Sequence, residues 1–479
     1  MRRRPGSLSP SRLLVAGAAT LVAAVVLPDA GQAKTLPDGG QANPLNCLVP
    51  VGQGAPAAAM PLRFGIYPGG PAGSVSAKAP PKPEDPGKRL AALRTLAGSN
   101  PFVVRLYSAW TGDVAADAGG GWLDGEIAGY TAAGLEVELV VRYKPLAPGG
   151  LAPSTFADHI RSVVRRYGRD PRFVSLQVTN EANLAGAPDA ADGAFAGATE
   201  ALVKGVIAAK NEVRRGGHEQ LRIGFSWAYD ERPEASSEFW AKLGRLGGPR
   251  FADAVDWVGL DTYPGTWAPQ IARSNSLPGH AASAVQESVR SLRDCFMPLA
   301  ALRQSTAVHI AENGFPTGPG RSDQLQSRVL DAMVRSVDAI RGRYGVTDYR
   351  WFDLRDSSST DQSIESQYGI TRDDYSPKPA FATYRDLIAR YGSVGARVAA
   401  AADCRRSPIR VVVPRWKSKR VTSLVVNVRG KVVERVRRRA PRAVRISMRS
   451  GRAAVRLKLT AHANGRRLTR IMRRAYRVC

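Results

Sequence analysis

The chain has 479 residues, of which 44% are hydrophobic, so it is long enough for one large domain with a sizeable core plus a small domain. Its formal net charge of +28 is concentrated at one end. Residues 401–479 hold 25 Lys and Arg against two acids, whereas the first 400 residues hold 44 basic and 39 acidic side chains. This distribution excludes a uniformly basic protein and indicates a nearly neutral body with a basic C-terminal segment.

The N-terminus has the pattern of an export signal. Arginines at positions 2, 3, 4 and 12 precede an apolar run over 13–27, which is short for a membrane span at 15 residues. Small residues at Gly31 and Ala33 suit cleavage after Ala33. The sequence therefore predicts a signal peptide over 1–33 and a secreted, extracellular protein, with an uncleaved anchor as the alternative.

The four cysteines are far apart, and none forms a C-x-x-C spacing. Because export permits disulfides, Cys404 and Cys479, which bracket the basic segment, are predicted to pair, leaving Cys47 with Cys295. The five histidines are also scattered. We therefore expect no metal site and no cofactor.

A strand–helix pattern repeats eight times after a Gly/Pro/Ala-rich lead-in over 34–60. The predicted strands are Leu62–Tyr67, Phe102–Tyr107, Leu135–Val141, Phe173–Thr179, Leu221–Trp227, Asp256–Tyr263, Thr306–Ala311 and Asp348–Asp353. Most are continuous apolar runs, as in parallel strands covered on both faces. The repeat predicts an α/β protein with a (β/α)8 TIM barrel over 61–395. A doubly wound sheet is the alternative, although no G-x-G-x-x-G follows the first strand.

The basic segment over 401–479 has a different sequence pattern from the strand–helix repeat. Short Val/Arg-rich runs separated by glycines predict a small all-β, sandwich-like domain. Its charge suits attachment to a cell envelope or an anionic glycan, nucleic-acid binding, or simple solubility. Export and the presence of only two aromatic residues, Trp416 and Tyr476, argue against nucleic acid. We expect a monomer.

Two of the predicted strands end at a glutamate. The fourth ends in Thr179-Asn180-Glu181, and the seventh ends in Ala311-Glu312. Barrels of this kind place their chemistry at the carboxyl ends of the strands. Cleavage of a glycosidic bond needs one carboxyl group to protonate the leaving oxygen and a second to attack the anomeric carbon, about 5–5.5 Å away in a retaining enzyme. A surface loop carboxylate is the alternative for either glutamate alone.

An Asn-Glu pair after the fourth strand, with a second Glu ending the seventh, resembles the retaining glycoside hydrolases of clan A, the 4/7 superfamily, over residues 60 to 395. Family 5 and family 39-like enzymes are the nearest relatives by this pattern. The resemblance implies that Glu181 is the acid/base and Glu312 the nucleophile. It also implies that Asn180 binds the 2-hydroxyl of the sugar.

The same resemblance assigns three further residues to the substrate site. Arg105 would support the nucleophile carboxylate, Tyr263 would hydrogen-bond to it, and Trp351 would form a platform for the sugar. The alternatives are a structural ion pair for Arg105, rim packing for Tyr263 and core packing for Trp351.

Several weaker candidates surround these residues. Trp227 and Trp267 could line subsites or pack, and Asp261 is expected to support the catalytic pair. His309 is expected to be a packed core residue that points away from the barrel axis, because it lies three residues before Glu312. The long loop over 357–377 is expected to form a wall of the cleft.

Together these patterns predict a secreted retaining glycoside hydrolase that cleaves β-O-glycosidic bonds in a polysaccharide or oligosaccharide by double displacement. The alternative is a non-catalytic glycan-binding protein on a barrel scaffold, anchored through the basic domain. The sequence leaves the sugar, the linkage and endo or exo action open.

Overall fold

The computed structural model describes residues 61–69, 80–112, 120–146, 153–271, 276–392, 409–413, 421–428, 431–437, 443–447, 451–463 and 466–478. The predicted signal peptide, the lead-in and Cys47, Cys404 and Cys479 lie outside these residues, so both disulfide pairings stay predictions. No helix within the described ranges is long and apolar enough to cross a membrane.

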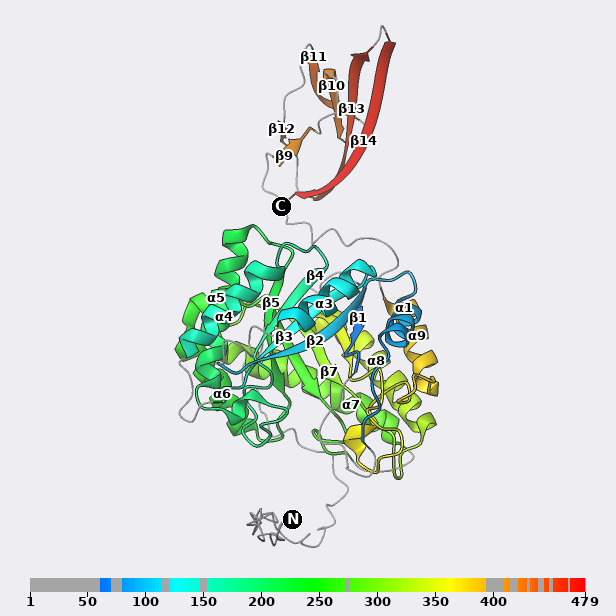
Figure 1. Cartoon of the computed structure of the whole chain (residues 1–479). Helices are drawn as coiled ribbons and strands as arrows, with labels where there is room; N and C mark the ends of the chain where they lie inside the picture. The colour runs from blue at the N-terminus through cyan, green and yellow to red at the C-terminus, as the bar shows by residue number, and fades with distance from the viewer. Residues whose placement is uncertain are drawn as a thin grey trace, which may run out of the picture. The chain divides into compact units, whose positions relative to one another are not determined.

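Eight parallel strands close into a barrel in chain order (Figure 1). They are β1 (Arg63–Ile66), β2 (Phe102–Trp110), β3 (Glu136–Tyr143), β4 (Phe173–Val178), β5 (Arg222–Ala228), β6 (Trp257–Thr262), β7 (Ala307–Asn313) and β8 (Val346–Trp351). Each overlaps the strand predicted for it, and the (β/α)8 fold is confirmed. Strands β4 and β6 are buried at every residue, which explains their continuous apolar sequences.

Helices connect the strands and cover the outside of the barrel (Figure 1). The α-helices are α1 (Pro86–Ala97), α3 (Gly120–Ala132), α4 (Pro153–Tyr167), α5 (Ala198–Gly216), α6 (Pro233–Ala254), α7 (Leu277–Arg290), α8 (Asp323–Tyr344) and α9 (Pro379–Tyr391). Short helical turns are η1 (Asp192–Ala194), η2 (Ser291–Phe296), η3 (Met297–Ala300) and η4 (Ile364–Ser366). Both ends of helix α8 are set by single residues. The Ser322 side chain caps its first turn, and Gly345 ends the helix in the left-handed conformation.

The inside of the barrel is charged. Arg105 on β2 donates to Glu138 on β3 at 2.8 Å, and Arg350 on β8 donates to Glu138 at 3.3 Å and to Asp348 at 2.8 Å. All four side chains are at most 2% exposed. Burial opposes the charge on Glu138, but Arg350 and Arg105 outweigh it and lower its pKa to about 2. Each buried charge in this network therefore has an opposite partner.

His309 on β7 belongs to this interior network, so the prediction that it points away from the barrel axis is wrong. Its Nε2 lies 3.1 Å from Asp348, and its ring stacks on Trp257 with centroids 4.2 Å apart. The register of β7 against β8 shifts between Ile310 and Asn313. This irregularity breaks the simple alternation, so that His309 and Glu312 both face the interior. The prediction that His309 is packed in the core holds at 4% exposure.

The C-terminal segment forms two antiparallel sheets. One has the order β11-β10-β13-β14, and the other pairs β12 with β9. Their bounds are β9 (Ile409–Val412), β10 (Val421–Val428), β11 (Lys431–Arg437), β12 (Ala443–Ile446), β13 (Gly451–Ala463) and β14 (Arg466–Val478). Leu424 and Leu457 of the larger sheet share a buried cluster with Val411 and Val444 of the smaller one. The all-β, sandwich-like prediction is confirmed.

Candidate active site

A cleft of about 710 Å³ opens at the carboxyl ends of the barrel strands. Side chains from almost every strand-end loop contribute to it. The lining comprises Tyr67, Tyr107, Arg142, Asn180, Glu181, Leu184, Ala187, Asp189, Ala190, Ala228, Tyr229, Asp230, Glu231, Arg232, Asp261, Tyr263, Trp267, Ala268, Glu312, Phe352, Glu365 and Tyr368. The cleft is thus rich in aromatic rings and carboxylates.

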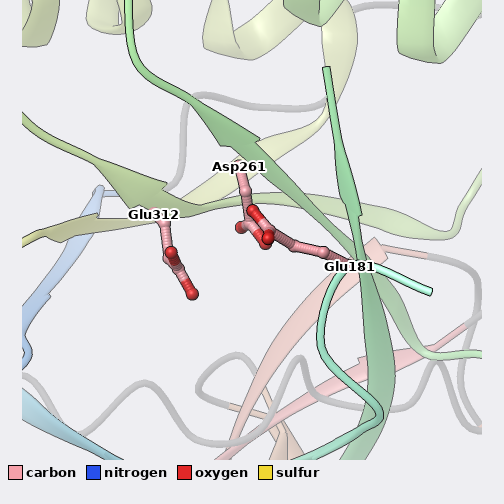
Figure 2. A group of neighbouring side chains, drawn as sticks. All are labelled: Glu181, Asp261 and Glu312. Carbon is pink, nitrogen blue, oxygen red and sulfur yellow. The ribbon is translucent and has the colours of Figure 1, made fainter. Parts of the chain in front are cut away.

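Three buried carboxylates meet at the base of this cleft. Glu181 follows β4, Asp261 lies on β6 and Glu312 lies on β7. One oxygen of each lies within 4.8 Å of the others, and Figure 2 shows the Glu181 side chain extending toward Asp261. The exposed fractions are 8% for Glu181, 2% for Asp261 and 6% for Glu312. The structure therefore brings the two glutamates together and places Asp261 beside them.

Glu312 is held by hydrogen-bond donors on both of its oxygens. Tyr107 donates to Oε1 at 2.5 Å, and Arg105 donates to the same oxygen from Nη2 at 3.2 Å. Tyr263 donates to Oε2 at 2.8 Å. Charge-assisted bonds of this kind stabilise an ionised carboxylate and fix its orientation. Arg105 and Tyr263 thus contact Glu312, as the family resemblance implies, while Tyr107 was not anticipated.

Glu181 sits on a constrained turn after β4. Thr179 and Glu181 have φ angles of 66° and 48°, in the left-handed region that non-glycine residues rarely adopt. Conformations of this kind cost about 1–3 kcal/mol each and persist where the surroundings fix them. The Glu181 amide donates to the Ser226 hydroxyl at 3.2 Å, which ties the turn to β5.

Asp192 is the main anchor of that turn. Its carboxylate accepts from the amide of Asn180 at 2.8 Å, the amide of Tyr143 at 2.7 Å and the Arg142 side chain at 2.9 Å. Burial raises the pKa of Asp192 to about 6, although Arg142 and these amides oppose the rise. The sequence offered no signal for this residue, because it lies in an irregular segment far from either glutamate motif.

The environments of Glu181 and Glu312 differ. No donor to the Glu181 carboxylate is found among the residues that the structure describes. Burial, followed by the charges of Glu312 and Asp261, raises the pKa of Glu181 well above its usual range, while Arg142 acts in the opposite direction. A carboxyl group in this setting holds its proton more tightly and can act as an acid, whereas hydrogen-bond donors meet both oxygens of Glu312.

Asp261 is more buried than either glutamate, but its carboxylate has fewer hydrogen-bond donors than that of Glu312. Neither of its oxygens meets a well-placed donor among the described residues, although the Ser226 hydroxyl lies nearby. Burial and the charge of Glu312 raise the pKa of Asp261 well above its usual range. The three carboxylates are also close enough together for a single cation to contact all of them.

Asn180 lines the cleft, but its side chain already has protein partners. Its Nδ2 donates to the carbonyl of Ala190 at 3.0 Å, and its Oδ1 accepts from Gln177 at 3.1 Å. One amide hydrogen and the remaining acceptor capacity of Oδ1 are left for a ligand. The expected contact with a sugar hydroxyl therefore stays a prediction.

The tryptophans divide between the core and the cleft. Trp351 is fully buried in the main hydrophobic core and is not part of the cleft lining, so its predicted role as a sugar platform does not fit its position. The next residue, Phe352, lines the cleft instead and stacks on Tyr67 with centroids 5.0 Å apart. Trp227 is also core, whereas Trp267 lines the cleft with 51% of its surface exposed.

The loop after β8 forms part of the cleft wall, as expected. Glu365 and Tyr368 contribute side chains to the lining. Gln326 on α8 donates to the carbonyls of Tyr368 and Gly369, at 3.2 and 3.1 Å, and so fixes this wall to the barrel.

No protein-family model matches the chain, and no curated protein matches it. Solved structures similar to the chain include a β-glucuronidase from Bacteroides uniformis, at 12% identity and a TM-score of 0.42, covering 82% of this chain and 43% of that one. A GH5_18 protein from Streptomyces cattleya in complex with GlcNAc has 17% identity and a TM-score of 0.49 over 70% and 81% of the two chains. A GH5_18 protein from Bifidobacterium longum subsp. infantis has 13% identity and a TM-score of 0.47 over 70% and 80%.

The chain spans less than half the length of the β-glucuronidases to which it is similar.

Proposed function

We propose that the protein is a secreted retaining glycoside hydrolase that cleaves β-O-glycosidic bonds in a polysaccharide or oligosaccharide. The observation that carries this proposal is the placement of Glu181 and Glu312, whose nearest oxygens lie within 4.8 Å at the mouth of a TIM barrel. Retaining enzymes hold their two carboxyl groups about 5–5.5 Å apart, whereas inverting enzymes need about 6.5–9.5 Å for a water molecule. The close approach of one oxygen of each group supports the shorter, retaining arrangement.

In the first step, Glu312 attacks the anomeric carbon of the bound sugar. Glu181 donates its proton to the glycosidic oxygen, the bond between that oxygen and the anomeric carbon breaks, and the sugar becomes an ester of Glu312. In the second step, Glu181 removes a proton from water, and the resulting hydroxide attacks the anomeric carbon and releases Glu312. Glu181 is then protonated again, so the cycle is closed.

The surroundings of the two glutamates support these roles. Glu312 receives hydrogen bonds from Arg105, Tyr107 and Tyr263, which stabilise the charge that a nucleophile needs. Burial and neighbouring acids raise the pKa of Glu181, which keeps the acid protonated for the first step. A non-catalytic glycan-binding protein would gain nothing from two acids in such different settings.

Two further parts of the proposal concern the ends of the chain. Export through the segment 1–33 would deliver the enzyme to extracellular substrate. The basic C-terminal domain would hold it on a cell envelope or an anionic glycan, because Arg456 and Lys458 are exposed between buried residues of β13. Binding of that domain should weaken as salt rises, since exposed charges are screened.

The stereochemistry of hydrolysis tests the proposal. A screen of aryl β-glycosides and unmodified polysaccharides identifies a substrate, and proton NMR then follows the first sugar released. A retaining enzyme releases the β anomer first. Release of the α anomer first would contradict double displacement, and binding without turnover across the screen would favour the glycan-binding alternative.

A further inference from the structure

The cleft is strongly acidic. Its lining contains seven carboxylate side chains and two arginines. Both arginines are already engaged by protein groups: Arg142 donates to Asp192 at 2.9 Å, and Arg232 donates to Asp230 at 2.8 Å. Within the described part of the chain, the lining therefore presents no cation that lacks an acidic partner, and its surplus charge is negative.

Asp261 is the acid of this lining that lies beside the catalytic pair. It is 2% exposed, lies within 4.8 Å of Glu181 and Glu312, and has only the Ser226 hydroxyl as a donor among the described residues. Arg105, whose charge acts to lower the pKa of Asp261, already bonds to Glu312 and Glu138. A buried carboxylate whose protein donor within the described ranges is one neutral hydroxyl, that of Ser226, is costly, so the site is suited to a ligand that brings further hydrogen-bond donors and positive charge.

We propose that the sugar bound beside the catalytic pair carries a protonated amine, and that Asp261 binds this amine. The substrate class would be β-glycosides of amino sugars with a free amino group, such as glucosamine oligomers. An ammonium group offers three donors and a positive charge to Asp261 and Glu312, while Glu181 supplies the proton for the first step. An N-acetylated sugar offers one neutral N–H, and a uronic acid would add a fourth carboxylate. This inference rests on the proposed glycosidase function of the same site.

Glu365 is a second acid that suits a cationic substrate. It lies in the cleft wall formed by the loop after β8, it is half-buried, and no hydrogen bond to its carboxylate is found within the described ranges. A glucosamine oligomer repeats its amino group on every sugar, so one chain could meet both Asp261 and Glu365. A single charged sugar could satisfy Asp261 alone.

Turnover of matched substrates tests the inference. Aryl β-glycosides of glucosamine, N-acetylglucosamine, glucose and glucuronic acid are compared by kcat/KM at a pH where the amine is protonated. We expect the glucosaminide to be preferred by about tenfold or more, as for a hydrogen bond to a charged group. Asp261→Asn should remove most of this preference, and Glu238→Gln, at an exposed acid on α6 outside the cleft lining, should preserve it.

An equal or better rate on the N-acetylglucosaminide, glucoside or glucuronide would overturn the inference while leaving the glycosidase proposal intact. So would an Asp261→Asn variant that keeps the wild-type preference for the glucosaminide, because Asp261 would then act only on the chemistry that all the substrates share.

Binding separates failure of the inference from failure of the proposed function. A sulfur-linked glucosamine disaccharide, which resists hydrolysis, and its N-acetylated counterpart are titrated calorimetrically into the intact protein. We expect about tenfold tighter binding of the amine form. That result without turnover on any glycoside would reject the glycosidase function alone, whereas equal affinities would reject the role of Asp261.

Discussion

Arg105 connects Glu312 to Glu138, donating from Nη2 to the first at 3.2 Å and from Nη1 to the second at 2.8 Å. Glu138 in turn accepts from Arg350, which also bonds to Asp348. The proposed nucleophile is therefore bonded to an ionic network of buried side chains inside the barrel. Its orientation depends on the same buried charges that hold the strands together.

Replacing Arg105 by methionine should harm both stability and activity. The substitution leaves Glu138 and Glu312 without a shared cation, and breaking a buried ion pair typically costs about 3–5 kcal/mol. Denaturant unfolding measures the stability and kcat measures the activity. Arg105→Lys keeps the charge but cannot bridge both carboxylates so well, so it should fall between wild type and Arg105→Met. Wild-type stability for Arg105→Met would contradict the network.

The pH dependence of kcat/KM should reflect the protonation of Glu181, the proposed acid. Its neighbours raise its pKa, so the protonated form needed for the first step persists toward higher pH, and kcat/KM should fall as pH rises through that pKa. Asp261→Asn removes one of the negative charges that raise this pKa. The alkaline limb should then move to lower pH. The surface control Glu238→Gln should leave the alkaline limb in place. An unchanged limb in Asp261→Asn as well would show that Asp261 does not act on Glu181.

Replacing Glu181 by glutamine should make the rate depend on the leaving group. Glutamine has no acidic proton, and general acid catalysis contributes about 10²–10⁴-fold. Substrates that leave as sugars or simple alcohols should lose about this factor in kcat/KM. Aryl glycosides with acidic phenols need no protonation, so their first step should be nearly unaffected. Equal losses of kcat/KM on both substrate types would contradict the assignment of Glu181 as the acid.

Asp192 should prove important although it does not belong to the catalytic pair. Asp192→Ala leaves the amides of Asn180 and Tyr143 without their acceptor, which costs about 1–3 kcal/mol for a buried donor. The turn that carries Glu181 should loosen, so kcat should fall as well. Asp158→Ala on α4, which removes an exposed ion pair with Arg161, should change stability by about 1 kcal/mol or less. Equal effects of the two variants would contradict the anchoring role.

Much of the fold and the central pair could be predicted from sequence. The eight apolar runs are strands because both faces of each strand are covered, and this burial is visible in the sequence. The two glutamates could be found because each directly follows or ends one of these runs. Strand count alone then places Glu181 and Glu312 at the same end of the barrel.

Other parts of the site depend on geometry that a sequence pattern does not contain. His309 faces the interior because β7 is irregular between Ile310 and Asn313, and no residue in that stretch signals a bulge. Trp351 is core and Phe352 lines the cleft, a difference of one position in side-chain direction at the end of β8. Asp192 reaches the turn at Asn180 through a tertiary fold-back that a local motif cannot reveal.

The nucleophile assignment is tested most directly by Glu312→Ala with and without azide, on an activated aryl β-glycoside. Alanine cannot attack the anomeric carbon, so hydrolysis should fall by several orders of magnitude. Azide fits the space vacated by the carboxylate and should restore the rate, forming an α-glycosyl azide by a single inversion. Near-native turnover of Glu312→Ala without azide would contradict the proposal that Glu312 is the nucleophile.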